Sequence, residues 1–238
     1  MVLNNGEKMP LIGLGTAGYT DQQLLTTALS SALSAGYRMI DTADLYSNHQ
    51  QIAAALEVIL PTQGLTRTNL FITTKIRPTD LGYLKCKYAV KRFLEELSTP
   101  YLDLVLIHAP HVPPILSMGP GPEGQKQLRK ETWHCLQELN EEGLVKSIGV
   151  SNYDEELLKE VMELGGTKPQ VNQVHMTPFY PQVLINDLKI SSKLFIFQDE
   201  LFKYASNQGI HMQAYSSLGS TTQSKILNNN IVHQVAKK

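Results

Sequence analysis

Four side chains capable of proton transfer stand at or just beyond the ends of three short apolar runs in the sequence. They are Asp41, Tyr46, Lys75 and His108, and the runs span residues 36–41, 70–75 and 102–108. Ligands of parallel α/β sheets bind outside the carboxyl ends of the strands, so polar side chains at these positions are typical of an active site. An acid, a phenol, an amine and an imidazole together indicate proton chemistry.

These four side chains suggest a way to donate a proton to an oxygen. A tyrosine hydroxyl is a weak acid, with an ordinary pKa of ~10, unless a nearby cation favours its ionised form. Lys75 is the candidate cation, and Asp41 would hold its ammonium group in place. His108 would donate a hydrogen bond to a substrate oxygen and orient it. The reduction of a carbonyl group to an alcohol requires such a site, together with a hydride donor that the four residues do not supply.

Strand-like and helix-like segments alternate along most of the chain. After a hairpin expected over residues 2–11, strands are predicted for the apolar run that ends at Thr16 and for residues 36–41, 70–75, 102–108, 144–150, 169–174 and 210–215. Helical stripes occur over residues 25–33, 83–97, 128–139, 157–161 and 226–235. Alternating β and α units imply right-handed crossovers and a parallel sheet, in which we expect seven strands.

The glycine-rich segment at residues 13–18 leaves two architectures open. Its spacing matches G-x-G-x-x-G, and Asp41 ends the following strand, as in the Rossmann dinucleotide-binding fingerprint. That fold would make Asp41 a ribose ligand and would give the other three proton-handling residues no role. In a closed β/α barrel, successive strands bring all four side chains around one pocket. We therefore favour an α/β fold of the TIM-barrel type.

Composition and charge narrow the class of protein. The 238 residues, 42% of them hydrophobic, suffice for a large core, and we expect one barrel domain over residues 1–238. A net charge of −1 makes no case for nucleic acid or an acidic membrane surface as a partner. Because no run of ~18 apolar residues is present, we expect a cytoplasmic protein without a membrane segment. Cys86 and Cys135 are expected to be reduced structural thiols, and the histidines lack the spacing of a metal site.

Six segments of the chain together resemble the aldo-keto reductases, a family of (β/α)8 barrels that use a nicotinamide cofactor without a Rossmann fold. The segments span residues 9–16, 36–46, 71–75, 101–108, 149–152 and 213–219, in family order. The resemblance implies an NADP-dependent reduction of a small aldehyde or ketone to an alcohol. It implies that Tyr46 is the general acid and that His108 orients the carbonyl, so that both contact the substrate. Lys75 and Asp41 would tune the acidity of Tyr46.

The resemblance also implies a set of residues that bind NADP(H). They are Gly15, Thr16 and Asp41 near the first two strands, Ser151, Asn152 and Gln173 around the carboxamide, Tyr215 stacked on the nicotinamide ring, and Ser216, Leu218 and Ser220 along the pyrophosphate. Ring stacking suits the flat nicotinamide, and backbone donors suit a doubly charged linker.

Each of these residues also has a plain structural interpretation. Asp41 and Lys75 could form an ion pair that only stabilises the fold, and Tyr46 could be a surface turn residue. His108 could be a core histidine with satisfied hydrogen bonds. Ser151 and Asn152 could cap the next helix. The joint occurrence of the first four at strand ends favours the catalytic interpretation.

Three departures from the family pattern bear on activity. The first is that Ala17 and Ala109 replace two frequent aromatic walls, so the substrate cannot be read from the sequence. His49 also stands where the family commonly has glutamate, but it lies beyond the four catalytic groups. Residues 183–197 look inserted before the sixth crossover helix. They are interpreted as an extra surface segment, as a substrate loop or as translated intron sequence.

The third departure is the C-terminal part of the sequence. After Ser220 a helix-like stretch follows without an eighth strand, so we expect an incomplete (β/α)8 barrel of seven strands. The family's motif for the 2′-phosphate of NADP would also be missing, with contacts worth ~1.5–3 kcal/mol each. We expect a monomer with a weakened hold on NADP(H). The alternative to an active enzyme is a catalytically impaired truncated isoform, or a regulatory or binding member of the same family.

Overall fold

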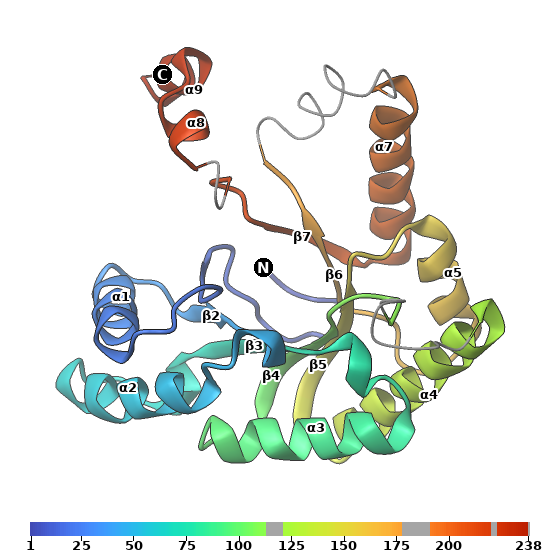
Figure 1. Cartoon of the computed structure of the whole chain (residues 1–238), viewed down its shortest axis with the longest axis horizontal. Coiled ribbons are helices and arrows are strands. Elements are labelled where there is room, and N and C mark those ends of the chain that lie inside the picture. Colours follow the sequence, from blue (N-terminus) through green and yellow to red (C-terminus); the bar gives the residue numbers. More distant parts are fainter. Residues whose placement is uncertain (113–120, 178–190, 220–222, 238) are drawn as a thin grey trace.

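The computed structural model describes residues 1–112, 121–177, 191–219 and 223–237. Their central feature is a sheet of seven parallel strands that curves into a nearly closed barrel (Figure 1). The strands are β1 (Gly13–Gly15), β2 (Met39–Asp41), β3 (Phe71–Ile76), β4 (Leu102–Ile107), β5 (Val145–Ser151), β6 (Val171–His175) and β7 (His211–Tyr215). Each pairs in parallel with the strand that precedes it in the chain, which confirms the predicted seven-stranded sheet.

The strand order decides between the two architectures that the glycine-rich segment left open. A Rossmann sheet reverses its strand order at a switch point, whereas the order here runs from β1 to β7 without reversal. The barrel is therefore the fold of this chain. Within it, the register sets Asp41 beside Gly15 on one side and Thr73 on the other.

Helices follow the strands and cover the outside of the sheet (Figure 1). They are α1 (Gln22–Ser34), α2 (His49–Thr62), α3 (Tyr83–Glu96), α4 (Pro122–Glu141), α5 (Glu155–Glu163) and α7 (Ser191–Gln208), with short 3-10 turns η1 (Asp44–Tyr46), η2 (Arg67–Asn69) and η3 (Pro78–Asp80). Helix α2 lies outside the predicted helices, although Ile52, Leu56 and Ile59 are buried along one of its faces at helical spacing. No helix within the described ranges is long and apolar enough to cross a membrane.

Two cores hold the layers together. In β4, Val105 and Ile107 belong to the large cluster between the sheet and its helices, which also contains the buried, free thiols of Cys86 and Cys135. The alternate residues Leu104 and Leu106 belong to a smaller cluster inside the barrel. Because side chains of a strand alternate between its two faces, one strand supplies both cores.

The N-terminal residues complete the inner core. The predicted hairpin is present in a short form, with one antiparallel bridge between Val2 and Lys8. Its Leu3 and Met9 side chains join the inner cluster, and Asn4 Nδ2 donates to Pro169 O at 2.8 Å just before β6. The hairpin therefore closes the barrel at the amino ends of the strands and leaves the carboxyl ends for chemistry.

The C-terminal part of the chain differs from its predicted outline. Residues 191–197, part of the expected insertion, form the first turns of α7, while residues 183–190 lie outside the described residues. The predicted final helix is two short ones, α8 (Gln223–Leu227) and α9 (Asn230–Ala236). Asn229 separates them because its side chain accepts the Ile231 N–H at 2.8 Å and so caps α9.

Candidate active site

Three of the four predicted proton-handling residues meet at the carboxyl ends of β2 and β3. Asp41 ends β2, Tyr46 is the last residue of the η1 turn that follows, and Lys75 lies near the end of β3. The Lys75 ammonium nitrogen is 2.5 Å from Asp41 Oδ1, 2.9 Å from the Thr42 carbonyl and 3.5 Å from the Tyr46 hydroxyl. Its three N–H donors thus face an anion, a carbonyl and a phenol.

The burial of Lys75 gives this arrangement its electrostatic character. The residue is 1% exposed, so its charge is largely removed from water. Burying an ammonium group is costly unless it is paired and its hydrogen bonds are made, and Asp41 and Thr42 meet both conditions. The same ammonium lies 5.1 Å from the centre of the Tyr46 ring. The phenol is therefore next to a positive charge that water screens weakly.

His108 completes the group from the next strand. It directly follows β4, and its ring centre lies 5.9 Å from that of Tyr46 with the two rings nearly perpendicular, at 86°. Burial, and secondarily the charge of Lys75, lowers the pKa of His108 to about 4, so the imidazole is neutral near pH 7. Its buried Nδ1 has no hydrogen-bond partner among the described residues.

The predicted cofactor residues lie around the same strand ends and are linked to these groups. Gln173 of β6 donates from Nε2 to Asp41 Oδ2 at 2.7 Å and to Gln213 Oε1 at 2.9 Å. Asn152 donates to the carbonyl oxygen of His108 at 2.9 Å and accepts from the Tyr215 hydroxyl at 2.9 Å. The strand ends from β2 to β7 are thus connected through side chains.

The helix-capping interpretation of Ser151 and Asn152 is wrong. Helix α5 is capped by Asp154, whose side chain accepts the Leu157 N–H at 2.9 Å. Ser151 is buried and donates from Oγ to the Gln173 carbonyl at 2.8 Å. Asn152 has a φ of 61°, in the left-handed region, and its side chain lies toward His108 and Tyr215.

The other predicted cofactor residues belong to the end of β1 and to the segment that follows β7 in the sequence. Thr16 is buried beside Gly15 and donates from Oγ1 to the Asp41 carbonyl at 3.0 Å, so it holds the end of β2 in place. Ser216 follows β7 with a φ of 53°, and Leu218 is 58% exposed. Ser220 lies outside the described residues.

Sequence reasoning missed a cluster of charged residues directly behind Tyr46. Asp44, at the start of η1, is 3% exposed and is bound by the side chains of Arg77 and Arg92. Burial alone would raise the pKa of this carboxyl, but hydrogen bonds from Arg92 and then Arg77 outweigh burial and hold the pKa below its ordinary value. The sequence carries no local signal for this cluster because Arg92 is 48 residues away from Asp44.

His49 is a second residue that the sequence left without a role. It is buried at the start of α2, with Nδ1 2.9 Å from Glu96 Oε2 and Nε2 2.9 Å from Thr74 Oγ1. Burial lowers the pKa of His49, while the Glu96 carboxylate opposes that shift. Thr74 neighbours Lys75, so His49 connects α2 and α3 to the strand that carries the buried ammonium.

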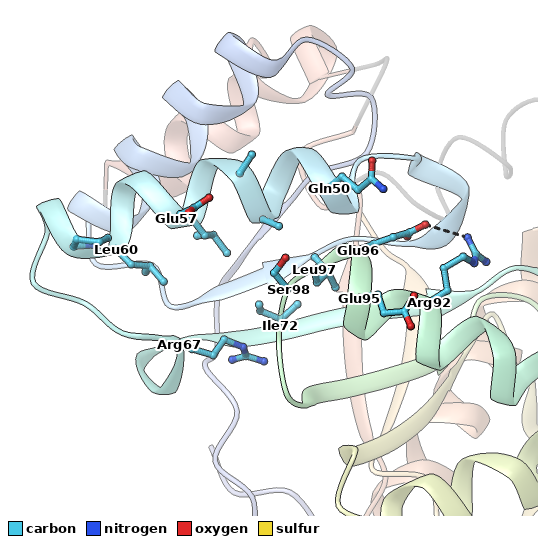
Figure 2. A pocket seen from close by; sticks show the side chains of 14 residues that line it. Gln50, Glu57, Leu60, Arg67, Ile72, Arg92, Glu95, Glu96, Leu97 and Ser98 are labelled. Carbon is cyan, nitrogen blue, oxygen red and sulfur yellow. Dashed lines mark ion pairs between the residues drawn. The ribbon is translucent and has the colours of Figure 1, made fainter.

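A groove of about 930 Å³ lies elsewhere, between the outer faces of α2 and α3 (Figure 2). Its lining includes Leu56, Ile72 and Leu97, and Glu96 and Arg92 form an ion pair at one end. The groove contains none of the predicted site residues. The described residues also hold no group of three or more His, Cys, Asp or Glu arranged for a metal ion. The strand ends therefore remain the candidate site.

Comparison with known proteins agrees with the resemblance of the motifs. The model of the family described as "Aldo/keto reductase family" matches residues 11–237. Glyoxal reductase of Bacillus subtilis (strain 168) is 34% identical over 236 residues, which are 99% of this chain and 72% of that protein. The crystal structure of an aldo/keto reductase from Brucella melitensis has a TM-score of 0.78 at 32% identity, with 100% of this chain and 77% of that chain covered.

A further solved structure carries a cofactor. It is the Bombyx mori aldo-keto reductase in complex with NADP, with a TM-score of 0.75, 28% identity, and coverage of 91% of this chain and 65% of that chain.

Proposed function

We propose, because this chain belongs to the aldo/keto reductase family, that it reduces an aldehyde or ketone to an alcohol with NADPH as the reductant. The observation that carries the proposal is the buried Lys75 ammonium, which lies 2.5 Å from Asp41 and 3.5 Å from the Tyr46 hydroxyl. A phenol beside a desolvated cation can release its proton to a developing alkoxide, since the cation stabilises the phenolate that remains.

The residues at the strand ends fit a nicotinamide cofactor. The amides of Asn152 and Gln173 match the donor and acceptor of a carboxamide, and Tyr215 offers an aromatic ring at the end of β7. These residues would hold the nicotinamide, with Ser151 beside them. When bound, NADPH would supply the hydride to the carbonyl carbon. The NADP complex of the Bombyx mori relative supports this choice of cofactor.

Side chains of the protein itself would transfer the proton and orient the substrate. Tyr46 would transfer the proton of its hydroxyl to the substrate oxygen, so that the carbonyl double bond becomes an alcohol once carbon has accepted the hydride. Lys75 would stabilise the resulting phenolate, and Asp41 would keep the ammonium in position. Neutral His108 would donate a hydrogen bond to the same oxygen, because its low pKa keeps the ring uncharged near pH 7.

A pair of tyrosine variants tests this assignment. Tyr46→Phe removes the proton donor and keeps the ring, so we expect NADPH oxidation with an aldehyde panel that includes glyoxal to fall ~10²–10⁴-fold. Tyr88→Phe is the matched control, because Tyr88 lies on α3 with 72% exposure, and it should keep the wild-type rate. NADPH binding, followed by fluorescence titration, should be the same in both variants.

Two outcomes would contradict the proposal. Equal rates in Tyr46→Phe and the wild type would remove Tyr46 as the acid. NADPH binding without turnover of any aldehyde or ketone would favour the alternative, a regulatory or binding member of the family.

A further inference from the structure

The turn that carries Tyr46 is too short to fix a side chain by itself. η1 has three residues, and its backbone is closed by Tyr46 N–H to Ala43 O at 3.0 Å and Ser47 N–H to Asp44 O at 3.2 Å. Short 3-10 turns have poor hydrogen-bond geometry and are marginal without support from the rest of the fold. Something else must hold the Tyr46 hydroxyl near Lys75.

Two arginine side chains bind Asp44, the first residue of this turn. Arg92 of α3 binds Asp44 with two parallel hydrogen bonds, Nη1 to Oδ1 at 2.9 Å and Nη2 to Oδ2 at 3.1 Å. Arg77, just beyond β3, donates from Nε to Oδ2 and from Nη2 to the Asp44 backbone carbonyl at 3.2 Å. Bidentate pairs between arginine and carboxylate fix orientation as well as charge. The side chain and backbone of Asp44 are thus both held.

The arginines are themselves oriented. Arg92 also lies 3.4 Å from Asp80 Oδ2 and 3.6 Å from Glu96 Oε1, the pair drawn at one end of the groove in Figure 2. Arg77 follows Lys75 by two residues, so one strand end carries the ammonium and an anchor for the turn. The end of β3 therefore positions both groups: it carries Lys75 directly, and through Arg77 it holds the turn that carries Tyr46.

We infer that Asp44 is a positioning residue, which through Arg77 and Arg92 holds the η1 turn so that the Tyr46 hydroxyl faces Lys75 and the substrate oxygen. This inference rests on the proposed function for its kinetic consequence. Asp44 acts through Tyr46, so its removal should slow proton transfer without changing how the cofactor binds. A displacement of ~1 Å in a reacting group can cost up to ~10²-fold in rate.

Asp44→Asn tests the inference, because it removes the charge and keeps the shape. We expect kcat to fall ~10- to 100-fold, with the Kd for NADPH within twofold of the wild type. In a Tyr46→Phe background the same substitution should change the residual rate by less than twofold, since the group it positions is gone. A further loss there as large as in the wild-type background would overturn the inference.

Glu160→Gln is the matched control for stability. Glu160 of α5 forms a bidentate pair with Arg129 of α4, with both distances 2.7 Å, and does not contact η1. This variant should lower Tm as Asp44→Asn does, while its kcat stays at the wild-type value. If Asp44→Asn also keeps the wild-type kcat, Asp44 only stabilises the fold and the inference is wrong.

A spectroscopic measurement keeps the inference separate from the proposed function. In protein labelled with 3-fluorotyrosine, the ¹⁹F signal of Tyr46 is identified by its absence in Tyr46→Phe. Asp44→Asn should shift or split this signal, and Glu160→Gln should leave it in place. A wild-type chain without reductase activity would contradict the proposed function alone, and an unmoved Tyr46 signal in Asp44→Asn would contradict the inference alone.

Arg92→Met provides a second variant in case Asp44→Asn does not fold. Arg92 is partly exposed and Arg77 still binds Asp44, so the same changes in kcat and in the ¹⁹F signal should occur at ~3- to 10-fold. Arg92→Lys retains the charge and should recover part of the rate. A wild-type kcat and an unmoved Tyr46 signal in Arg92→Met would overturn the inference.

Discussion

The strand ends of β2 to β4 and the chain from the end of β7 onward are built differently, although both are proposed to serve one reaction. At the first, Lys75 is 1% exposed and its ammonium contacts Asp41, Thr42 and Tyr46. At the second, Leu218 is 58% exposed, and neither hydrophobic core includes a residue of α8 or α9 among the described residues. The proton-handling groups are part of the folded core, whereas most described residues after β7 are exposed or half-buried and only Gly219 and Ile226 are buried among them.

This contrast teaches that chemistry and cofactor affinity should respond to different mutations. Substitutions at the first region should change stability and catalysis together. Each side chain there forms an ion pair or hydrogen bond that reduces the energetic cost of burying its neighbour. Substitutions at the second should change cofactor affinity with little effect on stability. Gln173 of β6 lies between the two regions and donates hydrogen bonds to Asp41 in β2 and to Gln213 in β7.

Lys75→Met should give the largest effect and is the strongest test of the difference between the two regions. It leaves the Asp41 carboxylate without its cation and with only the hydrogen bond from Gln173, so we expect a loss of ~3–5 kcal/mol in the free energy of unfolding, measured with urea. Reductase activity should fall at least ~10²-fold in the same variant.

Lys85→Met is the control, since Lys85 is exposed on α3, and it should change stability by less than ~0.5 kcal/mol. Equal costs for the two substitutions would show that the Lys75 ion pair contributes nothing to the fold. An Asp41→Asn/Lys75→Met double variant should regain part of the stability but none of the activity, because the unpaired charge is gone along with the cation.

The stability of the chain should also depend on pH through His108. Its pKa of about 4 in the folded chain is below the ordinary 6.5, so between these values the unfolded chain binds a proton that the folded chain does not. Stability should therefore fall as the pH decreases from 6.5 to 4, by at most about 3 kcal/mol from this group. Above pH 7 this group should contribute no slope.

Urea unfolding at pH 4.5, 5.5 and 7 measures this dependence, and His108→Gln should flatten it. The dependence will not vanish in the variant, because burial also lowers the pKa of His49 and His211. An identical slope in the wild type and His108→Gln would contradict the burial of a neutral His108.

Tyr215→Leu should give the smallest effect, and it tests the second of the two regions. It removes a ring that we propose stacks on the nicotinamide, an interaction worth ~0.5–1.5 kcal/mol, so the Kd for NADPH should rise ~2- to 12-fold. The free energy of unfolding should fall by no more than ~1.5 kcal/mol, because the Tyr215 ring also stacks on His175 with the ring centres 5.3 Å apart. Tyr215→Phe keeps the ring and loses the hydrogen bond to Asn152, so its Kd should stay within twofold. A large loss of stability without a change in Kd would assign Tyr215 to the core instead.

Much of this fold follows from local patterns in the sequence. The seven strands arise from short apolar runs, and their alternation with helices predicts a parallel sheet. The start of β2 was harder to predict. Gly36 has a φ of 94° and donates to the Leu33 carbonyl, so the first residues of the predicted strand at 36–41 belong to the end of α1. Gly36 is the first residue of that run, and its role in ending the preceding helix, which the helical stripe indicates, is confirmed.

The candidate site was predictable where it depends on strand ends and unpredictable where it depends on distant pairs. Asp41, Lys75 and His108 each end a strand, so one pattern found all three. Asp44 and Arg92 come together only because α3 packs beside η1, which no spacing in the sequence expresses. The strand-end pattern also drew attention to Tyr46, but neither it nor the family resemblance indicated the residues that hold its turn.

The order of the strands also has a consequence for the synthesis of the protein. Each strand pairs with the one before it, so the sheet can grow in the direction in which the ribosome delivers the chain. Each new strand closes a loop of only one β/α unit, which keeps the entropic cost of every step small. The residues from Asp41 to His108 can therefore meet in the nascent polypeptide while β5, β6 and β7 are still untranslated.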